Sequence, residues 1–443
     1  MSDKHSAETA KPMAAAEPVA TYKKPTGGNP ALRMLGIPNL PSKLPSRNWM
    51  IFLTLSTALA SAIIYDKREK KRATAKWHQV VSELGRQPLA NGNELPRRLT
   101  IFLAAPPGDG LRSAQDYYLE FIKPVLSDSG LDWEFVQGRQ QGDIRAAVAE
   151  KIRRRRRESE GIPQEALTTA QRIDAFRREK GLPEYEGIRG DIVVGRHAWK
   201  EYVRGTHEGW LGPLECPSHL VVPETPKPEA EKTEADSEKK EKERPPQPPS
   251  YNSTSEYPDE DIPRYIPGVF DPAQPVVYPH LLGFAGTFTR LWRYFNRRKL
   301  ADEVGAQVAA ACFAAHRGWA LDPAPESSEF AGQNEVQSAL AWEEKDWGKW
   351  VWEDEKPPAE GEEVPKIKKE RVWKHDVVLD PRISERMRRF ELLPEVQQKA
   401  DLVVVPEEKV EGWTKGSLRQ LWRWGVKQVQ GQQKKPTVEV DDE

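Results

Sequence analysis

Few residues in this chain have the types and spacing of known catalytic or ligand-binding motifs. Gly108-Asp109-Gly110 follows an apolar run, at a predicted strand-to-helix turn where backbone N–H groups can bind phosphate. A dinucleotide site would need a glycine in place of Ser113, and a P-loop would need Gly-Lys followed by Ser or Thr. Asp109 would also repel a phosphate. The pattern therefore favours a plain tight turn.

Nucleophilic and metal-ligating residue types are scattered along the chain. Cys216 and His219 have no second pair at zinc spacing, and neither G-x-S-x-G nor H-E-x-x-H occurs. Cys216 and Cys312 are the only cysteines, too few for a disulfide scaffold or a metal framework. Two unreactive or buried thiols are favoured, and a disulfide between them in an oxidising compartment remains an open alternative. We expect no catalytic residues, no cofactor and no metal.

A run of arginines ends one predicted helix. Its members are Arg153, Arg154, Arg155, Arg156 and Arg157. Cations are favourable at a helix C-terminus, and nearby glutamates dilute the charge, so a solvated helix end is favoured. The alternative is a patch that binds anionic lipid or an acidic partner beside a membrane.

Length and composition limit the class of protein. The chain has 443 residues, of which 37% are hydrophobic and 30% charged, and its 38 prolines are clustered. Globular chains are about 45–50% apolar, so this composition predicts ordered blocks between solvated segments and excludes a polytopic membrane protein. The net charge is −1. We expect no nucleic-acid partner, because binding one needs a clustered basic face.

The strongest signal is an uncharged apolar run from Trp49 to Tyr65, which contains neither Gly nor Pro. At about 1.5 Å per residue it is long enough for a short transmembrane helix. Trp49 and Tyr65 suit the headgroup region, and Arg47 and Lys67 flank the run. A buried core helix and a signal peptide are less favoured, because both flanks are charged and the run starts far from the N-terminus. Most nearby basic residues follow the run, which predicts the C-terminal bulk on the cytoplasm-like side.

An α/β unit is predicted after this anchor. Leu99 to Ala105, Asp132 to Val136 and Asp191 to Val194 have the composition of short strands. Helical patterns separate them, one ending near Pro124 and one beginning near Gly142. This order predicts a parallel or mixed sheet with helices packed on it.

The remaining chain predicts a second α+β block. His280 to Trp319 reads as helical, with a basic amphipathic stretch that favours packing on the sheet over lying at a membrane surface. Trp350 to Trp352 and Arg371 to Trp373 suggest a hairpin, and Leu402 to Val405 suggests a strand. The predicted segments are a disordered N-terminus (1–28), a juxtamembrane segment (29–48), a transmembrane helix (49–65), a basic juxtamembrane helix (66–98), an α/β domain (99–222), a disordered linker (223–262), an α+β block (263–427) with a disordered insertion (353–370), and a disordered tail (428–443).

Several stretches resemble one family. They are NPALRMLGIP, LPSRNWMIFL and YDKREKKRATAKW around the anchor, then LTIFLAAPPGDGLRSAQDYYLEFIKPVL, GDIVVGRHAWKEYVRGTHEGWLGP and PHLLGFAGTFTRLWRYFNRRKLADEVG. They are similar to the fungal Tim54 family of mitochondrial inner-membrane translocase subunits. The resemblance covers most of the chain that we expect to be ordered.

This resemblance implies a non-catalytic subunit of the carrier translocase, which inserts multi-spanning proteins. The implied partners are channel and accessory subunits of that complex, small intermembrane-space chaperones and membrane lipid. The implied topology is a single pass through the inner membrane, with the N-terminus in the matrix and the bulk in the intermembrane space. The charge count predicts the opposite orientation, and we follow the resemblance.

Two alternatives come from other classes of protein. The element order and the stretch LWRYFNRRKLADEVG are similar to diacylglycerol and sphingosine kinases, which implies a membrane-anchored lipid kinase. Those kinases carry Gly-Gly-Asp-Gly after a strand, whereas Gly195-Arg196-His197-Ala198 stands here. The other alternative is a single-pass tether of the secretory pathway. The sequon Asn252-Ser253-Thr254, in the predicted linker, would then be glycosylated.

Overall fold

The computed structural model describes residues 46–88, 92–162, 169–183, 187–220, 247–284, 286–321, 334–344, 370–411 and 413–430. The chain divides into two compact units, residues 1–61 and residues 62–443. The second unit, called here the α/β unit, contains every strand described below. The predicted N-terminal disorder, most of the predicted linker and nearly all of the insertion lie outside the described residues.

Helix α2 (Arg47–Gly85) contains the predicted transmembrane run. One window of this helix has a mean hydropathy of 1.5 and is entirely unburied, and by length and composition it is a candidate membrane span. The second half of α2 differs in character, because Trp77, Val80 and Val81 are buried in the α/β unit. The same helix therefore supplies both the candidate anchor and part of the core of the α/β unit.

The central sheet has four parallel strands in the order β2-β1-β3-β4. These are β1 (Arg98–Ala104), β2 (Asp132–Gly138), β3 (Gly190–Val194) and β4 (Ala273–Val276). Continuous apolar runs such as that of β1 are typical of parallel strands covered on both faces. The predicted α/β class and parallel sheet are confirmed.

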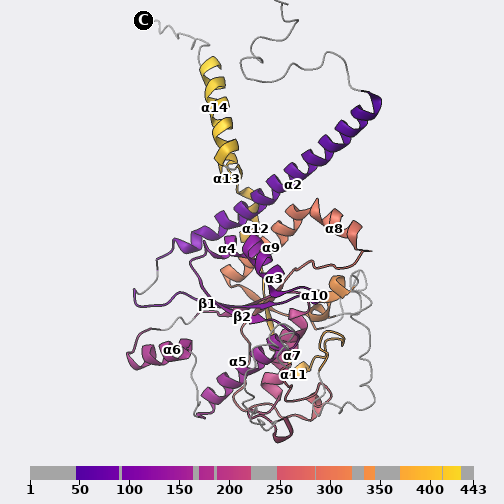
Figure 1. The fold of residues 1–443 in the computed structure, drawn as a ribbon. Helices are drawn as coiled ribbons and strands as arrows, with labels where there is room; N and C mark the ends of the chain where they lie inside the picture. Colours follow the sequence, from indigo (N-terminus) through magenta and orange to yellow (C-terminus); the bar gives the residue numbers. More distant parts are fainter. Residues whose placement is uncertain are drawn as a thin grey trace, which may run out of the picture. The chain divides into compact units, whose positions relative to one another are not determined.

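Helices cover both faces of this sheet (Figure 1). On one face lie α3 (Leu111–Tyr117), η1 (Tyr118–Ile122), α4 (Lys123–Leu126), α9 (Arg297–Phe313) and the second half of α2. On the other face lie α5 (Asp143–Ser159) and α7 (Ala198–Leu211). Strand β1 alternates between them, because Ile101 and Leu103 point to the first face and Phe102 to the second. The π-helical turn η1 comes directly before the turn that contains Pro124.

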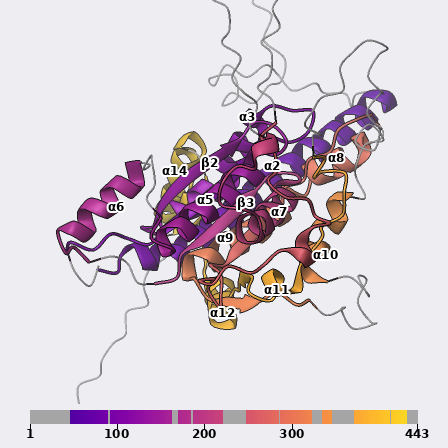
Figure 2. The same cartoon turned by 90° about the horizontal axis from the view of Figure 1, so that it is seen from below.

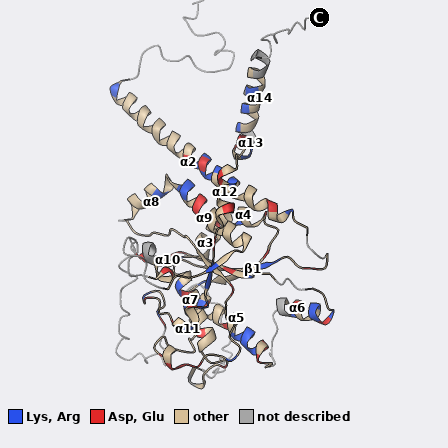
Figure 3. Ribbon diagram, turned by 180° about the vertical axis from the view of Figure 1, so that it is seen from behind, with Lys and Arg blue, Asp and Glu red and all other residues tan. Residues whose placement is uncertain are grey.

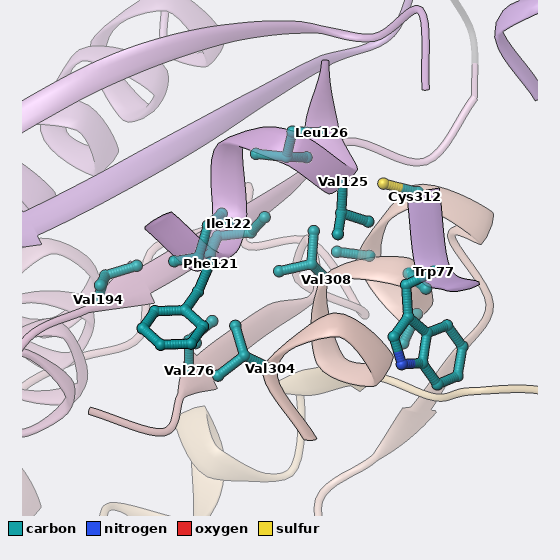
Figure 4. Close-up of a cluster of buried hydrophobic side chains, with 14 of the residues drawn as sticks. Trp77, Phe121, Ile122, Val125, Leu126, Val194, Val276, Val304, Val308 and Cys312 are labelled. Atoms are coloured by element: carbon teal, nitrogen blue, oxygen red, sulfur yellow. The ribbon is translucent and has the colours of Figure 1, made fainter. Parts of the chain in front are cut away.

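The core on the first face is built from segments far apart in the sequence. Phe121 and Ile122 of η1, Val304 and Val308 of α9, and Trp77 of α2 belong to one buried cluster (Figure 4). Trp77 is 1% exposed, and its indole N–H donates to Asp302 Oδ1 at 2.8 Å. Helix α2 is thus fixed to α9 inside the α/β unit.

The remaining elements lie outside this sheet, and two of them form a small second sheet. They are α6 (Thr169–Glu179), η2 (Ser218–Leu220), η3 (Tyr257–Asp259), α8 (Thr287–Tyr294), β5 (His316–Gly318), α10 (Glu335–Glu344), α11 (Pro381–Ser384), β6 (Arg388–Phe390), α12 (Pro394–Leu402), α13 (Glu407–Val410) and α14 (Trp413–Gln430). Strands β5 and β6 pair antiparallel. Figure 2 shows α6 set apart from the sheet.

Some local predictions were wrong. Arg371 to Trp373 begins a turn instead of forming a hairpin arm, and the other arm lies outside the described residues. Leu402 ends α12, and Val403 to Val405 forms no strand. Short apolar runs do not by themselves establish a strand, which explains both errors, and Val404 is 86% exposed.

The sequon also lies in a different setting from the one predicted. Asn252 is 4% exposed, and its side-chain oxygen accepts a 2.9 Å hydrogen bond from Arg204. Tyr257, also within the predicted linker, is 2% exposed. Asn252 and Tyr257 therefore pack against Arg204 of α7. The prediction of disorder failed there because local composition does not reveal an arginine that is distant in the sequence. The domain limits themselves stay a prediction.

Candidate interaction surfaces

The predicted anchor flanks lie on α2. Trp49 is 60% exposed and contacts Phe52 edge-on, with ring centroids 5.8 Å apart. Tyr65 is 56% exposed, and Lys67 is also exposed. Arg47 is the first residue of the helix. These placements suit a helix with amphipathic ends, and the membrane role of the four residues stays a prediction.

Helix α7 carries an ion-pair network that the sequence analysis missed. Glu208 is fully buried, and its carboxylate accepts hydrogen bonds from Arg145 and, at 2.6 Å, from Arg153. The backbone N–H of Tyr251 donates to the same carboxylate at 3.1 Å. Burial acts to raise the pKa of Glu208, but the surrounding guanidinium charges outweigh it and lower that pKa.

Arg204 extends this network toward residues far along the chain. Its Nε donates to Glu370 at 2.7 Å, and its Nη1 donates to the side chain of Asn252. The guanidinium also lies over the ring of Tyr257. The network joins α5, α7 and residues 248–252, which makes it a structural element of the α/β unit.

The arginine run of α5 is therefore partly internal. Arg153 is 3% exposed and binds Glu208. Arg156 donates to the carbonyls of Gly209 and Gly212 at 2.8 and 2.7 Å. Burial is the main cause of a lowered pKa at Arg156. The expectation of a wholly solvated helix end was wrong, because its acceptors come from α7, which is distant in sequence.

The other members of the run are more accessible. Arg154 and Arg157 both pair with Glu150, and Arg157 also donates to the Leu214 carbonyl at 2.6 Å. Arg155 pairs with Asp271 at 2.9 Å and is the most exposed of these three, with 56% of its side chain accessible. A lipid or partner contact by this run stays a prediction, and the accessible side of Arg155 is the part of the run best placed for one.

Two histidines near the carboxyl ends of the strands make contacts within the chain. His280 Nε2 lies 2.7 Å from the carboxylate of Asp109, the acidic residue of the predicted turn. After β3, His197 adopts a left-handed backbone (φ 66°), and its ring stacks on Trp373 with centroids 5.3 Å apart. Burial lowers the pKa of His197 well below its usual range. Buried and neutral, this imidazole belongs to the residues that follow β3, the point in the sequence at which the kinases carry Gly-Gly-Asp-Gly.

Other titratable groups of α7 are also enclosed. Glu201 accepts from the Trp373 indole N–H at 2.6 Å and from the Ile144 N–H at 3.1 Å, and burial raises its pKa to about 7. Burial lowers the pKa of His207 to about 4. The neutral imidazole of His207 accepts the Asp380 N–H at 3.0 Å.

Metal-ligating residue types and thiols are not brought together in the described part of the chain. Among these residues, no three His, Cys, Asp or Glu side chains are grouped to hold a metal ion. Cys216 is exposed and Cys312 is buried, both as free thiols, and burial raises the pKa of Cys312 to about 12.

Two helices instead present large apolar side chains to solvent. On α8, Phe288 is 81% and Trp292 71% exposed, and no residue of that helix is buried. On α14, Leu418, Leu421 and Trp422 are each more than 60% exposed. Basic residues accompany both apolar faces (Figure 3). The preference for α8 packing on the sheet was wrong, and exposed faces of this kind mark interaction surfaces.

Comparison with known proteins gives consistent matches. The family model described as "Inner membrane protein import complex subunit Tim54" matches residues 29–244 and 223–390. The chain is 48% identical to mitochondrial import inner membrane translocase subunit tim54 of Neurospora crassa, over 94% of this chain and 92% of the relative. The protein of that name from Aspergillus oryzae is 38% identical, over 87% of this chain and 93% of its own length. TIM54 of Saccharomyces cerevisiae is 27% identical, over 90% of this chain and 100% of its own.

Proposed function

This chain belongs to the Tim54 family of inner membrane protein import complex subunits, and from that membership we propose that it supports the insertion of multi-spanning proteins and docks small intermembrane-space chaperones. The relatives described above are named as mitochondrial inner-membrane translocase subunits and none as an enzyme. The chain is a translocase subunit with no catalytic role. The observation that carries the proposal is the match to the Neurospora crassa subunit along 94% of the chain.

The structure supports a subunit that works through its surfaces. Its α/β unit has cores on both faces of the sheet, so the exposed apolar faces are not needed for folding. The exposed face of α14 is of the kind that a complex buries. Partners are proposed to be channel and accessory subunits, the chaperones and membrane lipid. The N-terminus would lie in the matrix and the α/β unit in the intermembrane space.

The kinase and tether alternatives have less support. A lipid kinase would need a phosphate-binding loop after β3, where His197 is instead enclosed against Trp373. A secretory tether would be glycosylated at Asn252, which is buried against Arg204. The names of the relatives point to the mitochondrial inner membrane.

Import into isolated mitochondria tests the proposed function. Mitochondria depleted of this chain should insert much less of a radiolabelled multi-spanning carrier precursor into the carbonate-resistant fraction. A matrix-targeted precursor serves as the control and should enter at the normal rate, because it does not use this insertion route. Equal loss of both precursors would indicate a general defect of the inner membrane and would overturn the proposal.

Chaperone docking is tested by cross-linking in the same mitochondria. A thiol cross-linker at Trp422→Cys, on the apolar face of α14 and in a Cys216→Ser background, should capture a small chaperone while a carrier precursor is being imported. Ser159→Cys is the matched control, because Ser159 is exposed at the far end of α5. Capture at neither position, or equal capture at both, would count against docking through α14.

A further inference from the structure

Helix α8 has a one-sided apolar face that its own chain does not cover. Phe288, Leu291 and Trp292 recur at intervals of three and four residues, so they share one face. All three are more than half exposed, and Phe284, just before the helix, is 91% exposed. A soluble helix normally turns such a face toward the core, so this face is built to contact something else.

The charged residues within the α8 segment of the sequence all have one sign, although Arg297 and Arg298, after the helix, pair with Glu120 and Asp66. From Gly283 to Leu300 the sequence contains no acidic residue, and its basic residues are Arg290, Arg293, Arg297, Arg298 and Lys299. Arg290 and Arg293 fall on the side of α8 opposite Phe288 and Trp292. A basic polar side and an aromatic apolar side are typical of helices that lie in the interface of an anionic bilayer.

The position of α8 in the α/β unit also supports contact with an anionic bilayer. Two residues after α8, helix α9 begins and contacts α2 at the last residues of the predicted span. The Arg298 guanidinium lies over the Tyr65 ring, 5.2 Å from its centroid, and Arg298 Nη1 is 3.5 Å from Asp66 Oδ1. Because Tyr65 is predicted at headgroup depth, the C-terminal end of α8 lies close to the predicted bilayer surface, and its 8 residues span only about 12 Å.

We propose that α8 lies in the membrane interface, with Phe288, Leu291 and Trp292 inserted among the lipids and with Arg290 and Arg293 binding anionic phospholipid headgroups. This contact is a second attachment, which would orient the α/β unit against the bilayer that α2 spans. It rests on the lipid partnership named under the proposed function, but it requires neither a precursor nor a chaperone, so the two proposals can fail separately.

The test uses the full chain in liposomes that contain phosphatidylcholine with an anionic phospholipid. An environment-sensitive fluorophore is attached at Phe288→Cys in a Cys216→Ser background, where the buried Cys312 does not label. Spin-labelled lipid should quench this fluorophore strongly. The same fluorophore at Ser159→Cys, an exposed position on the opposite layer of the sheet, should be unaffected. Leu291→Cys gives the same readout if Phe288→Cys lowers the yield of folded chain.

Charge removal tests the headgroup contact. Each basic group near an anionic surface contributes about 1 kcal/mol, so Arg290→Gln with Arg293→Gln should shift the inserted-to-free ratio of α8 by about fivefold per residue. With vesicles of phosphatidylcholine alone, the unchanged chain should also lose quenching, because these vesicles have no anionic headgroups. Equal quenching at positions 288 and 159, or none at 288, would overturn the proposal and leave the face to a protein partner.

Discussion

Replacing Glu208 with glutamine is expected to destabilise the α/β unit by about 3–5 kcal/mol, the cost of breaking a buried ion pair from one side. Glu208 is the shared acceptor of Arg145 and Arg153, which are 0% and 3% exposed. An amide has no charge to offset two guanidinium groups, and its NH2 would face donors instead of accepting from them. Urea unfolding of the full chain in detergent micelles, followed by tryptophan fluorescence, measures the loss.

Glu150→Gln is the matched control for this prediction. Glu150 also pairs with two arginines of the same run, Arg154 and Arg157, but its side chain is 35% exposed. Surface ion pairs are worth about 0–1 kcal/mol, so this variant should unfold almost as the unchanged chain does. If the two variants lost similar amounts of stability, the buried network would not hold α5 against α7 as argued.

Replacing Trp77 with alanine is expected to cost about 3–5 kcal/mol, the usual range for deleting a large core aromatic. Trp77 packs tightly on α9, because a Cβ added at Gly305 would lie only 2.3 Å from its ring. The change would leave a cavity between α2 and α9 that neither helix backbone can close. It would also weaken the attachment of the α/β unit to the helix that carries the candidate span.

The control for Trp77 is the same substitution on the surface. Trp422 of α14 is 73% exposed, so Trp422→Ala should change the stability of the isolated chain by less than about 0.5 kcal/mol. Unfolding curves of the two variants would be compared in the same detergent. A small effect at Trp77 would show that the second half of α2 is not part of the core.

The sheet could largely be predicted from the sequence, because its central strands are continuous apolar runs. Leu99 to Ala105 was predicted as a strand, and β1 covers Arg98–Ala104. Strand β4 could not be recognised, because it has only four residues, Pro275 interrupts it, and Asp271 and Pro272 precede it. Proline is tolerated there because β4 lies at the sheet edge.

The charged groups were harder to predict than the sheet. Nothing local to Arg153 shows that Glu208, 55 residues later, accepts its hydrogen bond. Composition suggested solvent around the arginine run and around Asn252, whereas contacts with α7 bury Arg153 and Asn252. For α8 the amphipathic pattern was correct, but periodicity alone does not say whether core, lipid or partner covers the apolar face.

Protease protection of a C-terminal epitope tag tests most directly the claim that one span carries the α/β unit in the intermembrane space. The tag should resist protease in intact mitochondria and be digested once the outer membrane is ruptured, while a matrix marker stays intact. A tag that stays protected until the inner membrane is lysed would place the α/β unit in the matrix, as the flanking charges predict, and would contradict the account.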